Sequence, residues 1–196
     1  MSINNKYIID KKLRNDNNKI YTGTRIKDGK QIVCKYIKKN KINDVSKEVK
    51  ISKKILSING IVKFLDFYVD DSKFVIIMKK KPMDLWDYIS IQINLSEQEV
   101  IIIFNQLLKT LVYLYDIGIC HGDIKSDNIL INPDNLSIKL TDFEFSKKIG
   151  EYTIFSGTDV YICPEWYINQ KYNTDNFTVW SIGILLYEMI NGDIPF

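Results

Sequence analysis

Four polar side chains in the middle of the chain are spaced for chemistry on a phosphoryl group: Asp123, Lys125, Asn128 and, after two short apolar runs, Asp142. Phosphoryl transfer requires a positioned nucleophile and compensated negative charge, with little covalent help from the protein. Asp123 could accept the proton of an incoming hydroxyl, and Lys125 could neutralise charge on the moving group. Asn128 and Asp142 offer the hard oxygen ligands that Mg²⁺ prefers. The pattern therefore predicts a phosphotransferase that uses Mg²⁺.

Each of these residues alone would most often be an ordinary loop acid or a solvated lysine. Together, the order D-x-K-x-x-N, a strand pair and then Thr141-Asp142-Phe143 is hard to reach by chance. The segment His121–Asn128 resembles the HRDxxxxN catalytic loop of eukaryotic protein kinases, and Asp142-Phe143 resembles their metal-binding DFG. This resemblance implies that Mg-ATP is the cofactor and a protein the substrate.

Residues upstream of this loop fall where the resemblance requires them. Lys35 lies in an expected strand in the place of the kinase lysine that holds the α- and β-phosphates, and Glu48 lies in the next expected helix, where it can pair with Lys35. Singly, a strand lysine and a helix glutamate are most often solvated. The residues that the resemblance implies for ATP are Leu13, Asn15, Asn18, Ile20, Lys35, Glu48, Lys79 and Lys81.

The downstream segment Phe155–Trp166 resembles the end of a kinase activation segment, with Pro164-Glu165 in the place of the Pro-Glu pair. Lys125 and Gly157-Thr158 match the pattern of the serine/threonine-specific enzymes. The details resemble the Pim kinases, on four segments. These are Asp84–Ile89 (DLFDFI in Pims), Cys163–Trp166 (PPEW), Val179–Met189 (VWSLGILLYDM) and Gly192–Phe196 (GDIPF).

The Pim resemblance also implies a substrate preference. In that family, acidic residues in the catalytic loop and after the hinge read basic side chains N-terminal to the target hydroxyl, and Asp127, Asp84 and Asp87 match those acids. A carboxylate recognises a guanidinium through charge-assisted, often bidentate hydrogen bonds. We therefore expect Ser/Thr targets with arginine three residues upstream, and we place Thr158 in the substrate-binding segment. Solvated aspartates are the alternative interpretation, above all for Asp84.

Four departures from the kinase pattern bear on activity. The stretch Leu13–Ile20 contains no glycine where kinases have a Gly-rich loop, which predicts weaker ATP binding. Gly122 replaces the arginine of HRD, and Glu144 replaces the glycine of DFG and adds an anion beside the metal site. The sequence ends at Phe196, so we expect an uncovered apolar helix that self-associates or binds a partner. A pseudokinase that only binds or scaffolds is the main alternative; a small-molecule kinase is disfavoured by the Gly-Thr and Pro-Glu-Trp segment.

The elements that must position these residues indicate an α+β, bilobal protein-kinase-like fold. The 196 residues suffice for one kinase domain with a β-rich N-lobe at about 7–78 and a partial, mainly helical C-lobe at about 82–196 that lacks the last helices. We expect strands at 31–37, 62–69, 74–78, 129–131 and 137–140, and helices at 44–56, 97–117 and 178–190. Ser96 and Glu99 form a capping box ahead of the second helix. A cleft between the lobes is the expected ligand site.

Composition excludes several other classes of function. The net charge of +3, from 27 basic and 24 acidic side chains, is too balanced to predict nucleic-acid binding. The apolar runs Val100–Ile103 and Ile182–Leu186 are interpreted as buried helices, too short to cross a bilayer, so no membrane association is expected. Three distant cysteines without a CxxC pair disfavour disulfides and zinc and favour an intracellular, cytoplasmic setting. The lack of alanine and the two arginines indicate an AT-rich genome; if that genome is viral, the setting is the host cytoplasm.

Overall fold

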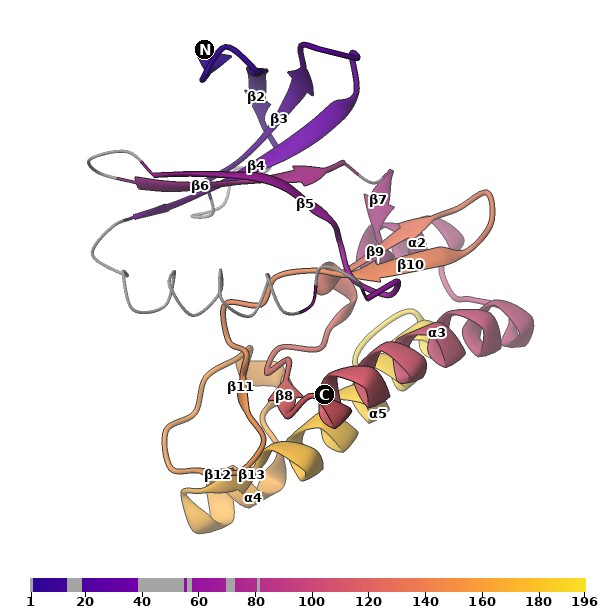
Figure 1. Cartoon of the computed structure of the whole chain (residues 1–196). Coiled ribbons are helices and arrows are strands. Elements are labelled where there is room, and N and C mark those ends of the chain that lie inside the picture. Colours follow the sequence, from indigo (N-terminus) through magenta and orange to yellow (C-terminus); the bar gives the residue numbers. More distant parts are fainter. Residues whose placement is uncertain (1, 14–18, 39–54, 56–57, 70–72, 81) are drawn as a thin grey trace. The chain divides into compact units, whose positions relative to one another are not determined.

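The structure is a computed structural model that describes residues 2–13, 19–38, 55, 58–69, 73–80 and 82–196. The chain forms two compact units (Figure 1). The first comprises Met1–Leu56 and Val62–Lys80, and the second comprises Ser57–Ile61 and Lys81–Phe196. No helix in the described part of the chain is long and apolar enough to cross a membrane.

The first unit is built on a six-stranded antiparallel sheet with the strand order β1-β2-β3-β4-β6-β5. Its strands are β1 (Ser2–Ile3), β2 (Tyr7–Lys12), β3 (Lys19–Arg25), β4 (Gln31–Lys38), β5 (Phe64–Val69) and β6 (Lys73–Lys79). The strands predicted around β4 and β6 are confirmed within a residue at each end. The predicted strand at 62–69 begins two residues later, at Phe64.

One face of this sheet carries an apolar core that follows the two-residue period of the strands. Its buried members are Tyr7, Ile9, Ile32, Cys34, Val75 and Ile77. Gly23 of β3 has no room for a side chain, because an added Cβ would lie 2.4 Å from the carbonyl oxygen of Ile8. The helix predicted at 44–56 lies outside the described residues except for Ile55, which is helical and buried.

The second unit combines helices with short strands. Its elements are β7 (Met83–Asp84), α2 (Leu85–Gln92), α3 (Glu97–Asp116), β8 (Ile119–Cys120), η2 (Ser126–Asn128), β9 (Ile129–Asn132), β10 (Ser137–Leu140), β11 (Lys147–Lys148), β12 (Glu151–Tyr152), η3 (Asp159–Tyr161), α4 (Pro164–Asn169), β13 (Tyr172–Asn173) and α5 (Thr174–Asn191). The strands form a β10-β9-β7 sheet and the pairs β11-β8 and β12-β13. The predicted hairpin at 129–140 is confirmed as β9 and β10.

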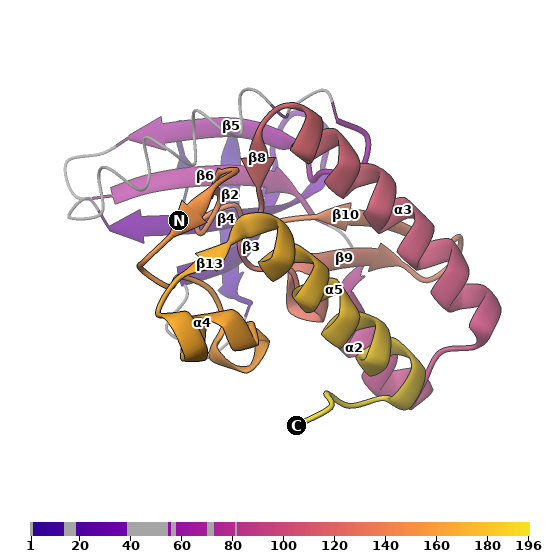
Figure 2. The same ribbon diagram turned by 90° about the horizontal axis from the view of Figure 1, so that it is seen from below.

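Helix α3 begins at the predicted capping box. The Ser96 hydroxyl accepts from the backbone N–H of Glu99, whose carboxylate accepts from the backbone N–H of Ser96. The helix packs against α5 and against β10 (Figure 2). The interpretation of Val100–Ile103 as wholly buried is wrong, because Ile101 and Ile102 point to solvent while the two flanking residues face the core. The 3.6-residue helical period turns adjacent residues to different sides.

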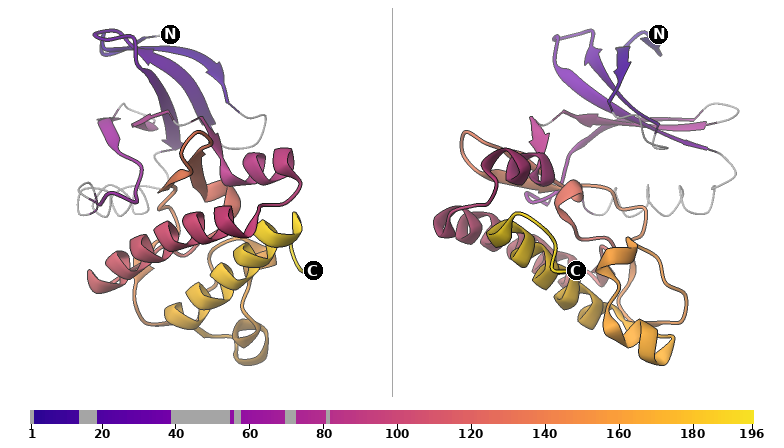
Figure 3. Two further views of the ribbon diagram at one scale, coloured as in Figure 1. Left: turned by 90° about the vertical axis from the view of Figure 1, so that its right-hand side faces the viewer. Right: turned by 180° about the vertical axis from the view of Figure 1, so that it is seen from behind.

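Helix α5 begins four residues earlier than predicted. The side chain of Asn173 accepts from the backbone N–H of Asp175, and this cap starts the helix at Thr174. Ahead of it, β13 and α4 lie beside the start of α5 (Figure 3). There Cys163, Tyr172 and Phe177 form a buried cluster that also holds the rings of Phe155 and Trp166. Three short ordered elements, β11, β12 and η3, lie between β10 and this part of the chain.

Candidate active site

Two short elements of the second unit position the catalytic loop. Strand β8 pairs with β11, with Cys120 opposite Lys147, and delivers His121 directly after the strand. Gly122 follows with φ +82°, and an added Cβ would lie 2.3 Å from the carbonyl oxygen of Phe145. This backbone is open to glycine and strained for any other residue. The glycine that replaces the kinase arginine at position 122 therefore suits the local backbone conformation.

Asp123 is buried and both of its carboxylate oxygens accept hydrogen bonds. Oδ1 accepts from the hydroxyl of Thr158 (2.7 Å), and Oδ2 accepts from the side-chain amide of Asn128 (2.8 Å). The ammonium of Lys125 lies 3.6 Å from Oδ2. Asp123 is therefore fixed in position as a candidate proton acceptor.

His121 supports this loop as a neutral side chain. Its Nδ1 accepts from the backbone N–H of Asp123 (3.3 Å), so Nε2 carries the proton and donates to the carbonyl oxygen of Thr141 (2.9 Å). Complete burial lowers the pKa of His121. The ring also meets the edge of Phe143, with the centroids 4.7 Å apart. His121 thus connects the catalytic loop to the Thr141–Phe143 segment.

Thr158 joins the catalytic loop to the downstream segment. Its hydroxyl donates to Asp123 and accepts from the ammonium of Lys125 (2.8 Å). Sequence reasoning placed Lys125 in catalysis and Thr158 in substrate binding, and the structure brings both to the same carboxylate. A substrate hydroxyl that approached Asp123 would meet a compensating positive charge beside it.

The two predicted metal ligands lie on segments that a backbone hydrogen bond joins. The backbone N–H of Thr141, which precedes Asp142, donates to the carbonyl oxygen of Asn128 (2.9 Å). The amide nitrogen of Asn128 is directed at Asp123, which leaves its Oδ1 for a cation. Asp142 has φ +61°, a sparsely populated region for a non-glycine residue that is concentrated at functional sites. An amide oxygen and a carboxylate fit Mg²⁺, although no group of three or more acidic, histidine or cysteine ligands occurs among the described residues.

Glu144 is accommodated beside Asp142. Its backbone N–H is 3.4 Å from Oδ1 of Asp142, the geometry of a short turn closed by the aspartate. Its side chain is half-buried. The predicted effect of this extra anion on Mg²⁺ binding stays a prediction.

Of the residues predicted to bind ATP, the structure describes Leu13, Ile20, Lys35 and Lys79, which belong to the first unit. Lys35 is buried on β4, where it is opposite Ile20 of β3. The backbone N–H of Leu13 donates to the carbonyl oxygen of Ile20 (2.8 Å), so these two predicted contacts are neighbours across the strand pair. Lys79 is exposed at the end of β6. Asn15, Asn18, Glu48 and Lys81 lie outside the described residues, so the Lys35–Glu48 pair stays a prediction.

The acidic residues predicted to bind substrate have different environments. Asp84 is buried and caps α2, because its carboxylate accepts from the backbone N–H of Asp87 (2.8 Å). This structural role was not predicted. Asp87 and Asp127 are half-buried, on α2 and η2, which pack against each other. The structure therefore brings the elements that carry Asp87 and Asp127 together.

Sequence reasoning missed two buried charged residues next to the active site. Glu188 of α5 accepts hydrogen bonds from the hydroxyls of Ser126 (2.8 Å) and Tyr161 (3.3 Å), and burial raises its pKa. A single carboxylate inside the apolar run of α5 was an available signal for this role. Lys147 of β11 is the second, and no local pattern distinguishes it from the exposed Lys148 beside it.

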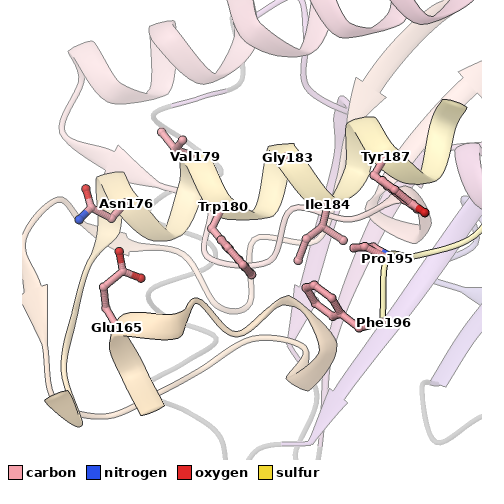
Figure 4. Close-up of a pocket in the computed structure, with 9 residues that line it drawn as sticks. All are labelled: Glu165, Asn176, Val179, Trp180, Gly183, Ile184, Tyr187, Pro195 and Phe196. Atoms are coloured by element: carbon pink, nitrogen blue, oxygen red, sulfur yellow. The ribbon is translucent and has the colours of Figure 1, made fainter. Parts of the chain in front are cut away.

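An apolar groove opens along the outer side of α5 (Figure 4). It has a volume of about 480 Å³ and is lined chiefly by α5, by Glu165 of α4 and by the last two residues. Trp180 stacks on Phe196 with the ring centroids 6.1 Å apart, and its indole N–H is buried without a hydrogen-bond partner in the described part of the chain. Val179 and Phe196 are 65% and 72% exposed. An exposed apolar surface next to an unsatisfied donor is typical of an interaction site.

Comparison with known proteins adds family information to this geometry. A family model described as "Protein kinase domain" matches residues 16–196. The chain is 33% identical over 199 residues to "Serine/threonine-protein kinase pim-2" of Danio rerio, an alignment that covers 90% of this chain and 64% of the relative. It is 29% identical over 189 residues to "Serine/threonine-protein kinase prk-2" of Caenorhabditis elegans, with 90% and 43% covered.

A third relative is "NUAK family SNF1-like kinase 1" of Homo sapiens, 32% identical over 187 residues, with 91% of this chain and 28% of the relative covered. The chain thus spans from about a quarter to just under two thirds of the length of these curated relatives.

Proposed function

This chain belongs to the protein kinase family, and we propose that it transfers the γ-phosphate of ATP to a serine or threonine hydroxyl of a protein. The observation that carries the proposal is the hydrogen-bonded set around Asp123, in which Thr158, Asn128 and Lys125 converge on one buried carboxylate. The relatives named above include two serine/threonine-protein kinases, one of them a Pim, in agreement with the resemblance in the sequence.

In the proposed reaction Asp123 orients the substrate hydroxyl and accepts its proton as the oxygen attacks. Lys125 compensates charge on the phosphoryl group, and the hydroxyl of Thr158 keeps the Lys125 ammonium in place. Asn128 through its Oδ1 and Asp142 through its carboxylate would hold Mg²⁺, and Lys35 would hold the phosphates. Mg-ATP, the usual cofactor of this family, supplies the transferred group and neutralises its oxygens. The chain's own contribution is therefore position and charge.

The proposed substrate has arginine upstream of the target hydroxyl. Asp127 and Asp87 support this preference because both carboxylates are partly accessible on two packed elements. Asp84 supports it less, since its carboxylate already caps α2. Each guanidinium–carboxylate contact would contribute about 1.5–3 kcal/mol, which is roughly tenfold or more in kcat/KM.

A pseudokinase is the second candidate function. The observations that favour it are the lack of glycine between Leu13 and Ile20 and the glutamate at position 144. Against it stands the retention of Lys35, Asp123 and Asp142. The two functions differ in turnover, because a pseudokinase that binds nucleotide transfers no phosphate.

The experiment that separates them measures labelled phosphate transfer from ATP to a peptide with arginine three residues before its only serine. We expect transfer by the wild type and at least about a 100-fold loss in Asp123→Asn, because general-base catalysis contributes about 10²–10⁴-fold. Asp134→Asn, in the exposed turn between β9 and β10, is the matched control and should keep wild-type activity. No transfer by the wild type would support the pseudokinase.

We also propose that the chain self-associates through the groove on α5. The groove exposes apolar side chains, and the Trp180 N–H has no partner among the described residues, which supports binding of another molecule there. A second copy of the chain presents an apolar face of the same kind. Sedimentation should show a concentration-dependent dimer that Val179→Glu abolishes, whereas Val112→Glu, on the exposed side of α3, should leave it unchanged. A monomer at all concentrations would contradict self-association.

An intracellular location is proposed on chemical grounds. Cys34, Cys120 and Cys163 are buried thiols without disulfides, and burial raises the pKa of each. Such thiols suit a reducing compartment, where ATP is also plentiful. Fractionation of the source cells would test this, and recovery in an oxidising compartment would contradict it.

A further inference from the structure

Lys147 is a buried cation that the proposed reaction does not use. Its ammonium donates to the hydroxyls of Ser156 and Tyr172, each at 2.5 Å. It also lies 5.0 Å from the ring centroid of Tyr152 and 5.2 Å from that of Tyr172. No ion pair joins it to a carboxylate of the described residues, and burial lowers its pKa. Among the described residues the charge is therefore stabilised by two hydroxyl oxygens and by the ring of Tyr152.

This arrangement is sensitive to geometry. A buried ammonium without a carboxylate is costly unless its donors are satisfied. Two hydroxyl oxygens and the Tyr152 ring stabilise Lys147 only while Ser156 and the β12–β13 pair keep their positions. Tyr172 is itself fixed, because its ring packs among Phe155, Trp166 and Phe177. Lys147 thus connects Ser156 to this packed aromatic cluster.

The segment held by Lys147 leads directly to the active site. Ser156 precedes Gly157 and Thr158, whose hydroxyl meets Asp123 and Lys125. Gly157 runs so close to the catalytic loop that an added Cβ would lie 2.9 Å from the carbonyl oxygen of Gly122. The backbone of Lys147 pairs with that of Cys120, the residue before His121. Lys147 therefore contacts both segments that meet at Asp123, one through its backbone and one through its side chain.

We infer that Lys147 is a positioning residue that holds Ser156–Thr158 against the catalytic loop, so that Thr158 reaches Asp123 and Lys125. The inference deepens the proposed function and rests on it for its kinetic consequence. Its structural part, the ordering of residues 156–161, stands without turnover. Glu188 contacts the other end of this segment through Tyr161, so Lys147 and Glu188 hold it from its two sides.

The test compares Lys147→Met with Lys148→Met, a matched control on the exposed neighbour in β11. Methionine keeps the apolar stem, removes the three donors and removes a buried charge that is costly to desolvate. We expect the melting temperature of the whole chain to hold or rise. Amide hydrogen exchange within residues 153–162 should nevertheless accelerate about tenfold or more, through local opening. Exchange in α3 should not change, and Lys148→Met should match the wild type everywhere.

Unchanged exchange at 153–162 in Lys147→Met would overturn the inference, and so would equal acceleration in every element, which indicates global destabilisation. If Lys147→Met does not fold, Tyr172→Phe serves instead, because it keeps the ring in its cluster and removes one acceptor. The same local acceleration, smaller in size, supports the inference, and unchanged exchange contradicts it.

A kinetic readout follows on the same proteins. Lys147→Met should lower kcat/KM for the peptide about tenfold while the KM for ATP stays unchanged, and this loss should nearly vanish in a Thr158→Ala background, because the two residues act as one unit. Additive losses would contradict positioning through Thr158. If the wild type transfers no phosphate, the proposed function fails, while the exchange measurement still decides the role of Lys147.

Discussion

The predicted functional residues of the two units differ in hydrogen bonding and exposure. In the second unit, Asp123, Lys125, Asn128 and Thr158 are joined by hydrogen bonds of 2.7–2.8 Å in and around a buried loop. In the first unit, the described nucleotide contacts are spread over several strands, Leu13 is 45% exposed, and the stretch 13–20 has no glycine. The groups proposed to set the rate of transfer are ordered by the fold, whereas the stretch expected to hold the phosphates departs from the family. We therefore expect nucleotide affinity, rather than the chemical step, to limit this kinase.

After substitution of Asp123, the proposed proton acceptor, the largest effect on kcat/KM is expected from substitution of Asp142. Asp142→Asn keeps the shape and removes the charge of the predicted Mg²⁺ ligand, so kcat/KM should fall about 100-fold or more, as when a main electrostatic stabiliser is lost. Titration of nucleotide with and without Mg²⁺ should show that the wild type binds more tightly with Mg²⁺ and that Asp142→Asn does not. Equal affinity of the wild type in both conditions would contradict Asp142 and Asn128 as metal ligands.

Thr158 tests whether the hydrogen-bonded set acts as a unit. Thr158→Ala removes one donor to Asp123 and one acceptor from Lys125, and hydrogen bonds to charged groups are worth about 1.5–3 kcal/mol each. Peptide kcat/KM should fall roughly 10–100-fold, mostly in kcat. Thr153→Ala, in the exposed part of the same segment, should be unaffected. A rate equal to that of the wild type would show that Thr158 only supports the segment.

Substrate preference should respond to Asp127 with a smaller and more selective effect. Asp127→Ala should reduce kcat/KM roughly tenfold for a peptide with arginine three residues upstream, since one charge-assisted contact is lost. The same change should leave a peptide with alanine at that position within about twofold. A peptide array that is indifferent to upstream arginine, or equal losses on both peptides, would argue against the preference.

The smallest effect is expected in the first unit and in the opposite direction. Asn15→Gly with Asn18→Gly should lower the KM for ATP a few-fold, because glycine permits closer backbone approach and positive φ. The kcat should stay the same, which is what separates this region from the catalytic loop. An unchanged or higher KM would show that the stretch 13–20 contacts the phosphates in another way, and the contrast between the two units would lose its basis.

Local signals in the sequence predicted much of the fold. The capping box at Ser96 and Glu99 and the β9–β10 hairpin follow from residues close together in the chain, and both are confirmed. The dense motif around Asp123 predicted the family, and the family model confirms it. The early start of α5 was missed because its cap, Asn173, comes before any apolar period begins.

The rest of the site depends on contacts between residues distant in sequence. Glu188 and Lys147 gain their roles from hydroxyls that only the folded chain brings near. Lys147 and Lys148 are identical neighbours in the sequence, yet one is buried and the other exposed. The alternation of a strand predicts that two such neighbours differ, but it does not say which one faces the core.

The central claim is that Asp123 acts on the hydroxyl while other residues hold the nucleotide. Its most direct test measures Mg-ATP affinity and single-turnover transfer on the same preparations of the wild type and Asp123→Asn. We predict nucleotide affinities within about twofold of each other and a transfer rate at least about 100-fold lower in the variant. Comparable transfer by both proteins would contradict the assignment, and so would a loss of transfer fully explained by weaker nucleotide binding.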